Sequence, residues 1–70
     1  MSILDNLYNA LTRKVQTANK DITRDIIEGW VGHDSDQARQ IAFMSEALGE
    51  LESGAYTPEE MVVDMLRLAH

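Results

Sequence analysis

The sequence predicts an all-α fold, in which each chain contributes three helices, the first of them long, to a bundle that we expect dimerisation to complete. Apolar residues recur at steps of three and four, and no stretch alternates with the period of two that strands show. Glycine, proline and capping residues divide the chain into three segments. The predicted helices span about residues 3–28, 35–53 and 58–69 of a single domain, residues 1–70.

The first segment, residues 3–28, contains neither glycine nor proline and carries one apolar seam. The seam consists of Leu4, Tyr8, Leu11, Val15, Ala18, Ile22 and Ile26. One continuous helix would be about 39 Å long, whereas a compact chain of this size is about 28 Å across. We therefore expect a second copy to cover the projecting part, with self-association through Leu4, Tyr8, Leu11, Val15, Ile22 and Ile26.

A break in the first helix near Asn19, Lys20 and Asp21 is the alternative, because three weak helix formers are adjacent there. The apolar seam keeps its phase across these residues, which favours a continuous helix. Gly29 is then expected to end this helix, and Trp30 lies in an apolar turn after it.

Capping patterns define the other two helices. Asp34, with Gln37 three positions later, predicts the start of the second helix, and Gly54 predicts its end. The sequence from Tyr56 to Met61 predicts the start of the third helix, with a threonine cap, a proline at the first helical position and a glutamate three residues after the cap. Tyr56 and Met61 are spaced to pack against each other across this start.

Charge is unevenly distributed along the 70 residues, whose net charge is −6. Residues 1–24 contain four basic and two acidic residues, a net charge of +2, and residues 25–70 contain two basic and ten acidic residues, a net charge of −8. An acidic total argues against non-specific binding to phosphates and favours a basic partner. The absence of a basic, apolar leader and of a long apolar run predicts a cytoplasmic protein without membrane association.

The sequence contains no motif for a cofactor, a metal ion or catalysis. It has no cysteine, and the group His33, Asp34 and Asp36 lacks the further ligands that calcium or zinc requires. Three short helices also offer little concavity in which to hold a catalytic group. We therefore expect neither a cofactor nor enzymatic activity.

Two aromatic residues and three basic residues are the candidates for binding a partner. Trp30 is either part of the core or an exposed anchor, and Phe43 lies at the edge of the apolar stripe of its helix. On the back of the predicted first helix, Arg13, Lys20 and Arg24 form a basic ridge at helical spacing.

These features predict a non-enzymatic protein-interaction module. We expect a small accessory or inhibitory protein, of the kind that phages and mobile elements encode, which acts by occupying a surface of a larger protein. One alternative is an acidic mimic of nucleic acid that blocks a nucleic-acid-binding protein. A second is a small transcriptional regulator that binds DNA through the basic ridge, which the acidic residues of the later helices disfavour.

Overall fold

Four α-helices form the described part of the chain, residues 2–32 and 36–68, in a computed structural model. They are α1 (Ile3–Val15), α2 (Arg24–Val31), α3 (Gln37–Ser53) and α4 (Pro58–Leu68). No strand occurs in these residues, so the all-α prediction is confirmed. The prediction of three helices is wrong, because the segment expected to form one helix over residues 3–28 forms α1 and α2.

The chain leaves the helical path after Val15, because side chains of the next residues bind backbone groups locally. The Thr17 hydroxyl donates to the carbonyl three residues before it at 2.7 Å, and the Asp21 N–H donates to Asn19 Oδ1 at 2.9 Å. Gln16 Nε2 donates to the Ile22 carbonyl at 2.8 Å. These bonds give the backbone an alternative to the helical ladder and so stabilise the turn.

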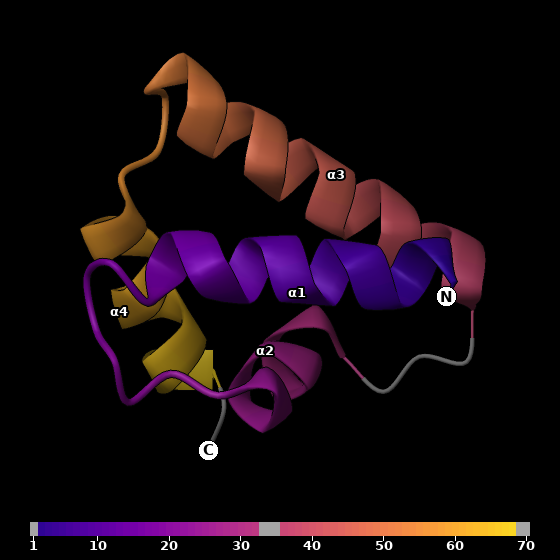
Figure 1. Ribbon diagram of the computed structural model, residues 1–70, viewed down its shortest axis with the longest axis horizontal. Helices are drawn as coiled ribbons and strands as arrows, with labels where there is room; N and C mark the ends of the chain where they lie inside the picture. The colour runs from indigo at the N-terminus through magenta and orange to yellow at the C-terminus, as the bar shows by residue number, and fades with distance from the viewer. Residues whose placement is uncertain (1, 33–35, 69–70) are drawn as a thin grey trace.

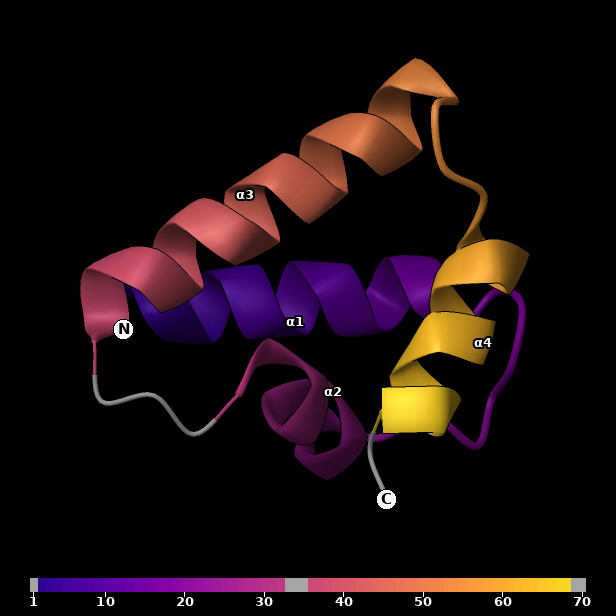
Figure 2. The ribbon, with the colours of Figure 1, turned by 180° about the vertical axis from the view of Figure 1, so that it is seen from behind.

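α1 runs through the middle of the molecule, with α3 on one side and α2 and α4 on the other (Figure 1). The reverse view shows the same order, with the C-terminal part of α3 diverging from α1 (Figure 2). α1 packs against all three other helices. The molecule measures 28 × 27 × 20 Å, so α2, by folding back on α1, removes the projecting helix that the sequence predicted.

The core is built from side chains of all four helices and of the turn after α1. Its members are Tyr8, Leu11, Val15, Ile22, Ile27, Met44, Ala47, Met61, Val62 and Met65. Four of the six side chains expected to form a dimer, Tyr8, Leu11, Val15 and Ile22, are thus buried inside a single chain. Leu4 and Ile26, the other two, are half-buried and pack against this core. The length argument for dimerisation therefore no longer applies.

The end of α2 also differs from the prediction. Gly29 lies within the helix, and α2 ends instead at Gly32, whose φ of 98° is in the region that glycine adopts readily. Trp30 is consequently a helical residue that packs on the core rather than part of a turn. A helical glycine costs about 1 kcal/mol relative to alanine, and the burial of apolar surface by the residues after it offsets that cost.

The end of α3 and the start of α4 follow the predicted capping chemistry, whereas the start of α3 differs from the prediction because Asp36 is its N-cap. α3 begins at Gln37, and the Asp36 side chain accepts from the Ala38 N–H at 3.0 Å. Two predictions about the start of this helix, a cap at Asp34 and a helical residue at position 35, lie outside the described residues. Position 69, the predicted end of the last helix, also lies outside them. Gly54 ends α3 with a φ of 81°, as predicted.

The start of α4 is the predicted capping box. The Glu60 N–H donates to Thr57 Oγ1 at 3.2 Å, and the Thr57 N–H donates to Glu60 Oε1 at 3.4 Å.

Among the described residues, none of the four helices combines the length and apolar content that crossing a bilayer demands.

The turn after α1 is tested by Asn19→Ala. We expect a loss of about 1 kcal/mol in the free energy of unfolding, because the Asp21 N–H loses its side-chain partner. Urea denaturation followed by circular dichroism measures this loss. Lys20→Ala, at a neighbouring exposed position, is the control, and we expect it to change stability by less than about 0.5 kcal/mol. A gain in both stability and helical signal for Asn19→Ala would contradict the role of this turn.

Candidate functional site

An aromatic pair joins α2 to α3 at the surface. The Trp30 and Phe43 ring centroids are 4.7 Å apart, and their planes meet at 67°, so the pair is edge-to-face. Trp30 is half-buried and packs on the core, whereas Phe43 is 42% exposed and is not part of the core. Trp30 therefore covers the core and remains partly accessible at the surface.

A pocket of about 240 Å³ lies beside this aromatic pair. Its lining comes from three helices and one connection, and comprises Trp30, Phe43, Glu46, Ala47, Glu50, Tyr56 and Met61. Ala47 and Met61 are buried core residues and form the base of the pocket, while Glu46 is exposed and Glu50 is half-buried. The pocket is thus apolar at its base and acidic at its edge.

The α-helical repeat places four of the lining residues on one face of α3. Phe43, Glu46, Ala47 and Glu50 follow at steps of three, one and three, which corresponds to one side of a helix. Glu46 and Glu50 are one turn apart, so their side chains start about 5–6 Å from each other. These four residues form one side of the pocket. The C-terminal part of α3 diverges from α1 (Figure 2).

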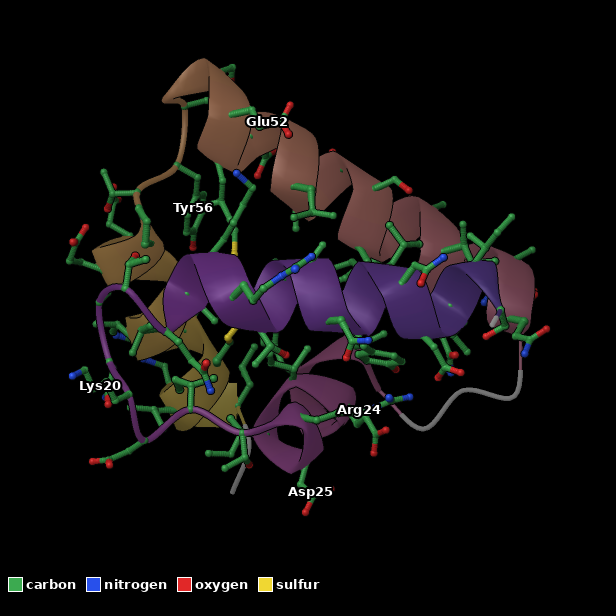
Figure 3. All side chains as sticks on the ribbon, viewed as in Figure 1. Lys20, Arg24, Asp25, Glu52 and Tyr56 are labelled. Atoms are coloured by element: carbon green, nitrogen blue, oxygen red, sulfur yellow. The ribbon has the colours of Figure 1, made fainter. Side chains whose placement is uncertain are left out.

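Tyr56 forms another wall, and the end of α3 determines its position. The left-handed turn at Gly54 reverses the chain, and the Tyr56 N–H then donates to the Glu50 carbonyl at 3.2 Å. Figure 3 shows Tyr56 between the C-terminal part of α3 and α4. The predicted packing partner of Tyr56, Met61, lines the same pocket.

The acidic side chains of the pocket are available to a partner. Across residues 2–32 and 36–68, neither the Glu46 nor the Glu50 carboxylate forms an ion pair or a hydrogen bond. Both glutamates line the same pocket as the aromatic pair, and an incoming cation would not have to displace a cation of the described residues.

The predicted basic ridge is not a single helix face, because the helix that would carry it is interrupted. Arg13 lies on α1, Lys20 lies in the connection after it, and Arg24 is the first residue of α2. In Figure 3 Lys20 is on the α4 side of the molecule, whereas Arg24 lies beneath α1. The ridge therefore lacks the continuous surface that its spacing implied.

Arg24 instead connects α1 to α2. Its Nη2 lies 2.6 Å from Asp5 Oδ1, its Nε lies 3.0 Å from Glu28 Oε1, and its guanidinium carbon lies 4.8 Å from the centroid of the Tyr8 ring. Arg24 and, less strongly, Ser2 hold the pKa of Asp5 below its ordinary value, and Asp5 and Glu28 raise the pKa of Arg24. Burial raises the pKa of Tyr8.

No group of three histidine, cysteine or carboxylate side chains is close enough to bind a metal ion within the described ranges. The sequence group that was weighed as a metal site includes His33 and Asp34, which lie outside those ranges. Asp36, its third member, is the cap of α3.

Sequence reasoning identified Trp30 and Phe43 but not the other pocket residues. The spacing of Glu46, Ala47 and Glu50 relative to Phe43 contained the relevant signal, since it puts all four on one face. That face appeared to be an ordinary solvated edge, because the sequence does not show that α3 diverges from the other helices.

Comparisons with known proteins provide no assignment for this arrangement. No family model matches the chain, and no curated protein and no solved structure matches it either. Any functional conclusion must therefore come from the chemistry of the chain itself.

The ion pair between Asp5 and Arg24 predicts a specific pH dependence. Arg24 lowers the pKa of Asp5 below 3.8 in the folded state, so the pair contributes stability above the ordinary value and loses it as pH falls through the lowered value. We expect Asp5→Asn to be less stable than the wild type at about pH 7, and the difference to disappear in strong acid. Urea denaturation across this pH range measures the difference.

Asp21→Asn is the control for this measurement. Asp21 is exposed, and its carboxylate makes no ion pair with any described residue. We expect this variant to follow the wild-type pH profile. A deficit of Asp5→Asn that persisted unchanged into strong acid would show that the lost stability does not come from the charge of Asp5.

Proposed function

We propose that the chain is a non-enzymatic protein-interaction module that binds a larger protein through the surface around Trp30 and Phe43. The observation that supports this most is the exposure of Phe43, a large aromatic side chain that lies beside a pocket and outside the core. Aromatic residues at the edge of a pocket are typical anchors of protein interfaces, because a partner can remove much apolar surface from water there.

The surroundings of Phe43 support the same proposal. Trp30 contacts it edge-to-face and is itself fixed on the core, so the two rings are held in position before a partner arrives. Ordered groups lose little conformational entropy on binding, which favours association. The Trp30 and Phe43 surface also borders acidic side chains that can orient a partner.

The proposed action is that of an accessory or inhibitory protein that covers part of its partner. Small size, acidity and the absence of a catalytic motif support this action, and size and composition support an origin in a phage or mobile element. A cytoplasmic location is supported by the lack of a long apolar run in the sequence. The regulator alternative needed a continuous basic ridge, and Arg13, Lys20 and Arg24 lie on three different segments. Nucleic-acid mimicry has only the net acidity as its support.

Phe43→Ala tests the proposal. We expect this variant to lose partner capture from an extract of cells that naturally contain the sequence, with the partner identified by mass spectrometry. Stability should fall by less than the roughly 3–5 kcal/mol that truncation of a fully buried phenylalanine costs, because Phe43 is 42% exposed and lies outside the core. Thermal unfolding of the purified variant measures this.

Val63→Ala is the matched control, because Val63 is 53% exposed on α4 and does not line the pocket. We expect this variant to capture the partner as the wild type does. Capture by Phe43→Ala at the wild-type level would contradict the proposed function. Unfolding of Phe43→Ala would instead show that this ring is part of the stabilising core.

Self-association is a separate question. A dimer through α1 would have to expose Tyr8, Leu11 and Val15, which one chain already buries. We therefore expect light scattering to give the mass of one chain, 7.9 kDa, over a wide range of concentrations. A mass that doubled with concentration would show a dimer, which would have to form through a surface other than the buried seam of α1.

A further inference from the structure

We propose that the pocket beside Phe43 binds the guanidinium group of an arginine side chain in a basic segment of the partner protein. This inference builds on the proposed interaction function, because it names the chemistry that the same surface recognises. Its basis is the combination of aromatic rings, an apolar base and two unpaired carboxylates in one pocket.

The volume of the pocket suits one side chain. Pockets that enclose small-molecule ligands usually measure about 300–1,000 Å³, and this one measures about 240 Å³. Ala47 and Met61 at its base offer apolar contact for a methylene stem, as long basic side chains require. The acidic edge then lies where the charged end of such a side chain would come to rest.

The charge of the pocket selects a cation. Glu46 and Glu50 lie one helical turn apart on the same face of α3, so a single planar group can approach both carboxylates. In an edge-to-face pair, the ring that points its edge at the other has neither of its faces covered by it. A cation binds favourably to an uncovered aromatic face. Arginine fits better than lysine, because its guanidinium stacks on rings and forms paired bonds to carboxylates.

The chain itself contains an example of the same recognition. The Arg24 guanidinium lies over the Tyr8 ring at 4.8 Å and binds the carboxylates of Asp5 and Glu28. The pocket presents the corresponding acceptors, an aromatic pair and the carboxylates of Glu46 and Glu50. In the described part of the chain, however, no arginine or lysine is paired with either glutamate.

The experiment titrates the intact protein with a blocked glycine-serine peptide that carries one central arginine. Chemical shifts in ¹H–¹⁵N spectra report binding, and the indole N–H of Trp30, the only tryptophan, marks the pocket directly. Twin peptides carry citrulline, which has the same shape without the charge, or lysine in place of arginine. We expect saturable shifts at Trp30 and residues 43–50 with arginine, weaker shifts with lysine and none with citrulline.

Charge variants locate the interaction. We expect Glu46→Gln combined with Glu50→Gln to weaken arginine-peptide binding about tenfold or more. Glu52→Gln combined with Glu59→Gln removes the same charge from exposed positions outside the pocket, and we expect it to change binding by less than about twofold. Raising the salt concentration from about 50 mM to about 500 mM should weaken binding of the arginine peptide.

Several results would overturn the inference. Equal shifts with the citrulline twin would show that the pocket takes a neutral side chain, and equal weakening by both pairs of variants would show attraction to net charge alone. The absence of any shift at Trp30 would show that arginine does not enter. In each case loss of partner capture by Phe43→Ala would still support the interaction function, so the two proposals fail separately.

Discussion

The structure depends on the turn that separates α1 from α2. A single chain of 70 residues buries the apolar seam of residues 3–28 only if this segment folds back on itself, because a continuous helix would leave much of the seam in water. Local bonds from Gln16, Thr17 and Asn19 stabilise this turn, and Ile22, within it, is fully buried. The turn therefore takes part in forming the core, and α2 can then cover α1 and meet α4.

Apolar burial, more than charge, holds the two helices together after this turn. Leu11 and Val15 of α1, Ile22 of the turn and Ile27 of α2 are fully buried, and burying a large apolar side chain contributes about 1.5–3 kcal/mol. The Arg24 pairs with Asp5 and Glu28 lie at the surface, where ion pairs contribute about 0–1 kcal/mol each. The role of Arg24 is therefore chiefly orientation, because it fixes how the start of α2 lies against α1. Arg24 was expected to bind a partner, but in this role it contacts Asp5 and Glu28 of its own chain.

The sequence predicts the start of α1, the end of α3 and the start of α4, since caps such as Thr57 and Gly54 act through groups that are close along the chain. It does not predict the turn after α1, and the reason lies in Ile26 and Ile27. Ile26 is apolar and fits the seam of one continuous helix, and Ile27 is apolar and fits the core when the helix is interrupted. The apolar pattern is therefore the same in both cases. In the structure Ile27 is fully buried and Ile26 half-buried, which is a shift of one position from the predicted seam. The pocket is also hidden in the sequence, because it depends on the angle between helices.

The pocket follows from how α3 is connected at its two ends. Trp30 near the end of α2 holds Phe43 on one side of the pocket, and the left-handed turn at Gly54 brings Tyr56 to another. The capping box then starts α4 in a direction that packs on α1 and α2, so the face of α3 from residue 43 to residue 50 lies beside an opening. The contact between Trp30 and Phe43 thus fixes one wall, and the backbone bond from Tyr56 to Glu50 fixes another. A partner would meet aromatic and acidic groups that are already in place, and little of its binding free energy would be lost in ordering them.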